Sequence, residues 1–151
     1  MRTGRGVEVQ ISFGSFIATV AEVEVDEAGE VSVRRIVTAV DTGIVVNPDT
    51  VIAQLQGGLL FGLTAALYGE ITIGKGRVQQ SNFNDYRMLR IDQTPAIEVH
   101  IIKSGEAPGG LGEAGTNAAP PAICNALFAA TGVRLRHLPI DRDALARRKQ
   151  V

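Results

Sequence analysis

The chain has little of what metal and redox centres in proteins are usually built from. It contains one cysteine, Cys124, and no tryptophan in 151 residues. One cysteine excludes an internal disulfide and any cysteine-rich zinc or iron–sulfur site. The histidines His100 and His137 are far apart in the sequence, and no group of Cys or Asp lies near either of them. A zinc site is therefore not expected, and Cys124 is interpreted as a small buried apolar residue.

The chain also lacks an excess of charge of either sign. Its 15 basic and 16 acidic residues give a net charge of −1. Without a basic patch, nucleic acid is not an expected partner. No apolar segment follows the charged residues 1–6, so a signal peptide is not expected. A reducing, cytoplasmic compartment is the simple expectation, with a periplasmic location only if a partner subunit is exported with the chain.

One stretch, residues 50–69, lacks charge altogether and is long enough to span a bilayer as a helix. It contains Gln54 and Gln56 as well as glycines, and no cluster of Lys or Arg flanks it. We therefore predict a buried helix and no membrane span. Because Gly57 and Gly58 lower helix propensity, we expect a neighbouring segment to come very close to them.

Alternating apolar and polar residues predict strands in the first 40 residues. The stretch 7–25 is rich in Val, Ile and Phe, and Gly14-Ser15 interrupts it, which indicates a bulge or a bend. Residues 31–40 predict a strand antiparallel to the preceding one. A short hairpin is expected within 70–80, and a further strand within 96–103.

Two main helices are predicted. Asn47 can cap the first of them, at 48–68, and Pro48 suits its first position. The second is predicted at 119–131 and ends before Gly132, a candidate left-handed C-cap. The fold class is therefore α+β, with antiparallel strands packed on two main helices. A short charged helix is expected near the C-terminus.

The most informative segment is 109–115, which places one carboxylate, Glu113, among four glycines just before a predicted helix. Its glycine spacing matches the dinucleotide fingerprint GxGxxG. That motif needs an acid about 20 residues on, and the next acid here is Asp141, beyond a second break. A carboxylate inside the loop would also repel a pyrophosphate. A nucleotide site is therefore not expected.

Glu113 leaves three interpretations open. It can be an ordinary exposed loop carboxylate. It can belong to an anion-binding loop, since glycine backbone and a helix N-terminus both favour anions. It can also be the one acid or base at a site for a large ligand, because flanking glycines allow close approach.

Four stretches resemble the C-terminal part of the molybdenum-binding large subunit of xanthine oxidase-type hydroxylases, in the branch of the isoquinoline 1-oxidoreductase beta subunit and related aldehyde dehydrogenases. They occur in the family's order and cover nearly the whole chain. They are Arg5–Val7 with Ser12–Ser15; Ala39–Asp49 running into Gln56–Leu63; Asn82–Arg87 with Pro95–His100; and Gly112–Gly115 leading to Asn125–Gly132.

The resemblance implies that residues 1–151 are the C-terminal portion of a molybdopterin-binding domain, incomplete as given. It implies hydroxylation of an N-heteroaromatic compound, or oxidation of an aldehyde, with water as the oxygen source. Glu113 is implied as the general base, and Gly112, Glu113 and Ala114 as the residues near the cofactor. The family often has proline where this chain has Ala114, which is a mild departure.

The resemblance also implies a molybdopterin cofactor with molybdenum, expected in its cytosine dinucleotide form. Family large subunits are several times longer, and most of their cofactor and substrate contacts lie upstream. The expected partners are therefore the upstream part of the large subunit, an iron–sulfur small subunit, and a small heterocycle or aldehyde. We expect the chain to be inactive alone.

Two alternatives from other classes stay open at this point. The chain could be a structural module without catalysis, or a small anion-binding protein that uses the glycine loop. A piece of a larger domain should expose apolar area, so we also expect poor solubility or self-association of the isolated chain.

Overall fold

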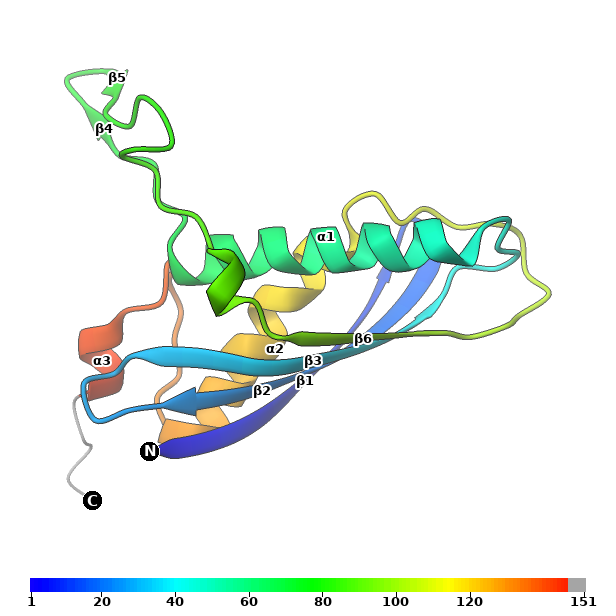
Figure 1. The fold of residues 1–151 in the computed structure, drawn as a ribbon, viewed down its shortest axis with the longest axis horizontal. Coiled ribbons are helices and arrows are strands. Elements are labelled where there is room, and N and C mark those ends of the chain that lie inside the picture. The colour runs from blue at the N-terminus through cyan, green and yellow to red at the C-terminus, as the bar shows by residue number, and fades with distance from the viewer. Residues whose placement is uncertain (147–151) are drawn as a thin grey trace.

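The computed structural model describes residues 1–146, and its centre is a four-stranded sheet in the order β1-β2-β3-β6 (Figure 1). The strands are β1 (Arg2–Ser12), β2 (Ser15–Val25), β3 (Val31–Asp41) and β6 (Ala96–Ile101). The first three form an antiparallel meander, as the alternation predicted. β1 begins at Arg2 rather than near Val7, because it pairs with β2 over its whole length.

The interruption at Gly14-Ser15 is a tight hairpin turn rather than a bulge. Phe13 and Gly14 form the turn, with φ angles of 51° and 79°, and Ser12 pairs with Ser15. Positive φ at both turn residues matches the twist of a two-residue hairpin. The irregularity of this sheet lies instead at Glu22/Val23, where the register between β2 and β3 shifts.

The prediction of a wholly antiparallel arrangement was wrong for the last strand. β6 pairs with β3 in parallel, with Arg35 opposite Ala96 and Val40 opposite Ile101. Parallel neighbours need a long crossover, and here it contains helix α1 (Pro48–Leu67) and the arm that follows it. The antiparallel pairings within the meander still make the sheet mainly antiparallel.

Helix α1 begins and ends close to the predicted residues. The Asn47 side chain accepts hydrogen bonds from the backbone N–H groups of Asp49 at 3.0 Å and Thr50 at 3.3 Å, and Pro48 takes the first position. The helix is long and apolar enough to cross a membrane by length and composition alone. Its fully buried leucines, Leu55, Leu59 and Leu63, lie in the core of this fold.

Helix α2 (Ala114–Thr131) begins five positions earlier than the predicted start at 119. Pro120 and Pro121 come directly after the predicted start, and proline is favoured in the first turn of a helix. The structure places them inside the helix. Ala114 and Gly115 are buried against α1, and this packing outweighs the poor helix propensity of the segment. The end at Gly132, with φ 73°, is as predicted.

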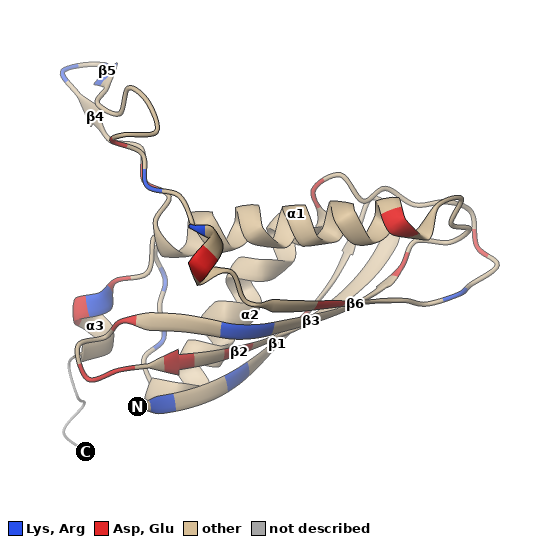
Figure 2. Cartoon of the chain, viewed as in Figure 1, with Lys and Arg blue, Asp and Glu red and all other residues tan. Residues whose placement is uncertain are grey.

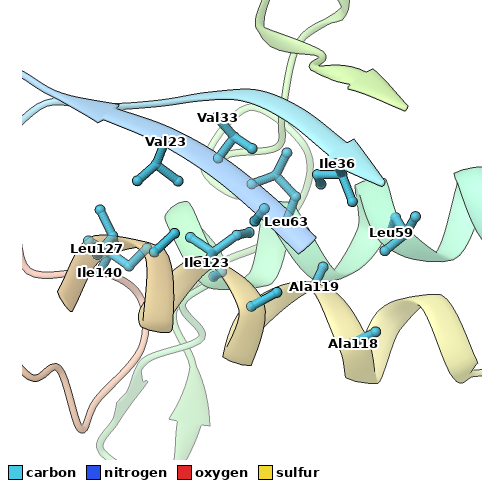
Figure 3. Packing of buried hydrophobic residues seen from close by; sticks show 14 of the residues in the cluster. Val23, Val33, Ile36, Leu59, Leu63, Ala118, Ala119, Ile123, Leu127 and Ile140 are labelled. Atoms are coloured by element: carbon cyan, nitrogen blue, oxygen red, sulfur yellow. The ribbon is translucent and has the colours of Figure 1, made fainter. Parts of the chain in front are cut away.

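The core lies between one face of the sheet and the two long helices (Figure 3). The helices cross through their smallest residues: a Cβ on Gly58 would lie 3.1 Å from the Cα of Gly115. The predicted close approach at Gly58 is therefore confirmed, whereas Gly57 has nothing within 4 Å of its Cβ position. The larger buried side chains of the core are Ile17, Val23, Val25, Val33, Ile36, Val40, Leu55, Leu59, Leu63, Ile123, Leu127, Ile140 and Leu145.

A long arm projects from the body after α1 (Figure 1). It carries the predicted hairpin, shorter than expected, as β4 (Ile73–Gly74) and β5 (Arg77–Val78). A 3₁₀ turn, Ile91–Gln93, leads back to the sheet, and the short C-terminal helix is α3 (Arg142–Ala146).

Candidate functional site

Three connections meet at one end of the sheet (Figure 1): the β1–β2 turn, the segment after β3 and the long loop that leads into α2. Backbone hydrogen bonds join them. Gly110 donates its N–H to the carbonyl of Phe13 at 2.8 Å, and Gly109 donates to the carbonyl of Thr42 at 2.9 Å. The glycine loop therefore has a fixed path over the end of the sheet.

Two buried hydroxyls support this loop from below. Ser15 Oγ and Thr42 Oγ1 lie 2.9 Å apart. Ser15 Oγ is 2.9 Å from the carbonyl oxygen of Gly110, and Thr42 Oγ1 is 3.1 Å from that of Gly109. A Cβ on Gly109 would lie 2.5 Å from Ser15 Oγ, so only glycine fits this close approach.

Glu113 is the N-cap residue of α2, and its side chain is exposed and makes no capping hydrogen bond. Its carbonyl accepts the first helical bond, from Asn117 at 3.1 Å. The carbonyl of Gly112 accepts a hydrogen bond from Gln54 Nε2 at 2.8 Å, and that of Ala114 accepts one from Gln10 Nε2 at 3.0 Å. The backbone is thus held on both sides of Glu113, while its carboxylate is left free.

The two glutamines come from different elements, Gln54 from α1 and Gln10 from β1. Sequence reasoning missed their role. Gln54 was visible only as one of the few polar residues in a mainly apolar helix, and Gln10 only as one polar residue of an alternating strand. No sequence pattern indicates that both reach the loop around Glu113, because these contacts span 58 and 104 positions of the chain.

The three residues predicted near the cofactor differ in their surroundings. Gly112 and Glu113 are exposed, and a Cβ on Gly112 would meet nothing within 4 Å. Ala114 is fully buried, so its methyl group packs in the core. A ligand at this end of the molecule can approach Gly112 and Glu113 directly. The cofactor role of all three residues stays a prediction.

An open hollow of about 260 Å³ lies next to the glycine loop. The segment after β3, the start of α1 and the loop itself line it, with Ile44, Val46, Thr50 and Leu111 among its residues. The hollow is mainly apolar, and Ile44 and Val46 are exposed. An apolar hollow next to the glycine loop is suited to part of a large, partly apolar ligand.

The other candidate residues do not gather into a second site. Cys124 is half-buried rather than fully buried, and burial raises the pKa of its thiol. His100 lies 4.0 Å from Glu98 on the sheet, far in the chain from His137. Within residues 1–146 no three His, Cys, Asp or Glu side chains are placed to hold a metal ion.

Sequence reasoning also missed Glu8, which lies on the helix-facing side of β1. It pairs with Thr19 of β2, which is opposite Thr38 of β3, and the two threonine hydroxyls bond each other at 2.7 Å. Among the described residues Glu8 Oε2 is buried without a hydrogen-bond partner. Burial raises the pKa of Glu8 from its ordinary 4.5 to about 7, since a charge without a partner is disfavoured away from water.

We expect Glu8→Gln to raise the free energy of unfolding at pH 8 by roughly 1–2 kcal/mol. The whole pKa shift would correspond to a larger free energy, but water reaches part of the carboxyl group and reduces the effect. The folded-state pKa of Glu8 is raised, so its protonated form is favoured on folding. In the unsubstituted chain, the stability that protonated Glu8 contributes is present below pH 4.5 and is lost as the pH rises to about 7. Urea unfolding at pH 4.5 and pH 8 measures this difference. The exposed Glu27→Gln is the control, and an equal gain at both pH values would contradict the prediction.

Comparison with known proteins places this geometry in context. The family model described as a molybdopterin cofactor-binding domain matches residues 3–95. The isoquinoline 1-oxidoreductase subunit beta of Brevundimonas diminuta is 43% identical over 89% of this chain and 17% of its own length. A membrane-bound aldehyde dehydrogenase of Gluconacetobacter polyoxogenes, named with pyrroloquinoline quinone, is 44% identical over 80% of this chain and 16% of its own.

Solved structures show the same fold. The aldehyde oxidoreductase of Desulfovibrio desulfuricans is similar with a TM-score of 0.78 and 27% identity, over 87% of this chain and 15% of its own. The chain therefore spans less than a fifth of the length of these relatives.

Proposed function

The chain belongs to the molybdopterin cofactor-binding domain family, and from this premise we propose that it supplies Glu113 as the general base of a molybdenum hydroxylase. The relatives carry names of N-heterocycle and aldehyde oxidoreductases. We propose the same substrate classes for the complete enzyme, with water as the source of oxygen. We propose molybdopterin as the cofactor rather than the pyrroloquinoline quinone in one relative's name, because the family model that matches this chain describes a molybdopterin cofactor-binding domain.

The observation that carries the proposal is the free carboxylate between two held peptide groups. A general base must reach the proton that it removes, within about 3 Å, and must keep that position through turnover. Gln54 and Gln10 fix the backbone on either side of Glu113. Because no capping bond engages the side chain, its oxygen atoms can accept a proton from a ligand.

The residues present fit a large cofactor in front of the loop. A Cβ on Gly112 would meet nothing within 4 Å, so the space next to Glu113 is open. We propose that Gly112, Glu113 and the backbone of Ala114 lie against molybdopterin in its cytosine dinucleotide form. When bound, this cofactor supplies molybdenum and so the capacity to accept two electrons from the substrate carbon. Within residues 1–146 no three His, Cys, Asp or Glu side chains of the chain gather to hold the metal themselves.

We propose that the rest of the large subunit and an iron–sulfur subunit complete the enzyme, and that the chain is inactive alone. The relatives support this, since more than four-fifths of their length lies outside the matched part. The substrate pocket is assigned to that remaining part. We place the complete enzyme in the cytoplasm, or in the periplasm if a partner subunit is exported with it.

The proposal is tested by metal content. The chain is co-expressed with the Brevundimonas diminuta subunit from which the matching segment has been removed, and the complex is purified through a tag on this chain. We expect molybdenum and pterin to co-purify in equal amounts with the chain. A complex that forms without molybdenum would leave a structural module as the better description.

A further inference from the structure

Helices α1 and α2 pack on one face of the four-stranded sheet (Figure 3). On the opposite face, here called the outer face, the alternate side chains of all four strands are exposed or half-buried. Antiparallel sheets with one face in water normally carry polar residues there. The outer face follows this rule in one half only.

The half of the outer face nearest the glycine loop is apolar. Val9 is 73% exposed and Ile11 70%. Strand β6 carries Glu98 and His100 on this face, so the apolar surface ends at β3. An exposed apolar surface with a polar rim marks a contact with another molecule. The surface is here called the apolar patch, and the strand register places its members side by side: Val7, Val9, Ile11, Phe16, Ala18, Val20, Val37 and Ala39.

The other half of the outer face carries charges that already have partners within the chain. Arg5 of β1 bonds Glu22 of β2 at 2.7 Å. Arg35 of β3 bonds Glu98 of β6 at 2.7 Å and lies 3.9 Å from Glu22. Figure 2 shows the charges of β1, β2 and β3 toward the end of the sheet away from the glycine loop. Taking paired charges out of water costs free energy that a contact must offset, so we assign this half to solvent.

The apolar patch extends to the candidate site. Ile11 and Phe16 form the next-to-last pair of the β1–β2 hairpin. In the turn of that hairpin, the carbonyl of Phe13 accepts a hydrogen bond from Gly110 at 2.8 Å, three residues before Glu113. A molecule that covers the patch therefore reaches the loop that carries Glu113.

We propose that the remaining part of the large subunit packs face to face on the apolar patch. This inference rests on the proposed function, in which that part completes the cofactor site and must reach the same end of the sheet. The relatives support it, since more than four-fifths of their length lies outside the matched part. The surface that fits the patch is apolar and carries no charge at its centre, as the cores of protein interfaces do.

Two other modes of contact fit the structure less well. Strand addition at the free edge of β1 is opposed by Asn125 Nδ2, which donates to the carbonyl of Val7 at 2.9 Å in the middle of that edge. A second copy, related by a twofold axis along the strands between β2 and β3, would set Val7 against Glu98 and Val9 against His100. Such a copy would place polar groups on the exposed valines.

Substitutions inside and outside the patch test this assignment. The tagged chain is co-expressed with the Brevundimonas diminuta subunit that lacks the matching segment, and the amount of that subunit in the purified complex is measured. Val9→Glu should lower this amount at least about tenfold, because an unpaired carboxylate would be buried in an apolar interface. Val9→Ile should leave it unchanged. Thr3→Glu should also leave it unchanged, since Thr3 is an exposed position of the same strand and face in the charged half.

A loss of binding must be separated from a loss of folding. Val9 is largely exposed in the isolated chain, so Val9→Glu alone should keep the circular dichroism spectrum and an unfolding midpoint in urea close to that of the wild type. Phe16→Glu makes a second change of the same kind on β2, and it should reduce the complex to a similar extent.

The outcomes distinguish this inference from the proposed function. Equal amounts of the subunit with Val9→Glu and with the wild-type chain would overturn the docking surface and leave the proposed role of Glu113 untouched. A wild-type chain that binds no subunit, or that uses the patch to form a dimer instead, would overturn it as well. A complex that Val9→Glu disrupts, but that contains no molybdenum, would support the docking surface and contradict the proposed cofactor role.

Discussion

Replacing Gly62 of α1 by alanine should lower the free energy of unfolding by about 2–3 kcal/mol. A Cβ at this position would lie 2.5 Å from the carbonyl oxygen of Thr116 and 3.1 Å from the Cβ of Ala119, both on α2. The nearest atom belongs to backbone, which cannot rotate away as the end of a long side chain can. The two helices must therefore move apart where they cross.

Gly57→Ala is the matched control, because it makes the same change on the same helix. Its Cβ would meet nothing within 4 Å, so only the gain in helix propensity remains, about 1 kcal/mol of added stability. The two substitutions should thus shift stability in opposite directions. Urea unfolding of both variants measures this, and equal effects would show that the helix crossing tolerates an extra methyl group.

The helix crossing also links the core to the candidate site. Thr116 stands three residues after Glu113, in the first turn of α2, and its hydroxyl donates to the carbonyl of Gly58 at 3.3 Å. Gly115 is as tightly placed, since its Cβ would lie 2.7 Å from the N atom of Leu59. The small residues of the two helices therefore decide where Glu113 stands relative to α1.

Local signals in the sequence predicted most elements but not how they are joined in space. The Asn47 cap, the C-cap at Gly132 and the alternation along β2 depend on neighbours in the chain, and all three were predicted correctly. The parallel pairing of β6 with β3 depends on where the chain goes after α1. The start of α2 at Ala114 depends on the packing of Gly115 against Leu55 and Leu59, which no local signal in the sequence indicates.

The same distinction between local signals and long-range contacts applies to the candidate site. Glu113 stands out in the sequence because it is the one carboxylate among the glycines. The groups that hold it, Gln10 and Gln54, are common polar residues in unremarkable surroundings. Glu8 is similar: its alternation with valines predicts a strand, but only the fold shows that it lies on the helix-facing side of β1 with one carboxylate oxygen buried and, among the described residues, without a partner. Residue type thus indicates the reacting group, and long-range contacts determine its setting.

Glu113→Gln should reduce turnover of the complete, cofactor-loaded complex by about 10²–10⁴-fold, the range for loss of a general base. Glutamine keeps the size and hydrogen-bonding capacity of the side chain but cannot accept the proton. Because the Glu113 side chain is exposed and makes no capping bond, the fold should lose less than about 0.5 kcal/mol. Molybdenum content should be unchanged, which separates a loss of proton transfer from a loss of cofactor.

Glu106→Gln gives the matched control, since Glu106 is another exposed carboxylate of the same loop. It should retain full turnover, because the backbone carbonyl of Glu106, rather than its side chain, accepts the bond from Ile44. Steady-state rates with an aldehyde and with an N-heterocycle, each at saturating concentration, measure both variants. Normal turnover in Glu113→Gln would remove the catalytic assignment and leave the carboxylate as an ordinary exposed N-cap. A loss that reached Glu106→Gln as well would point to a general charge effect of the loop, not to one base held between Gln10 and Gln54.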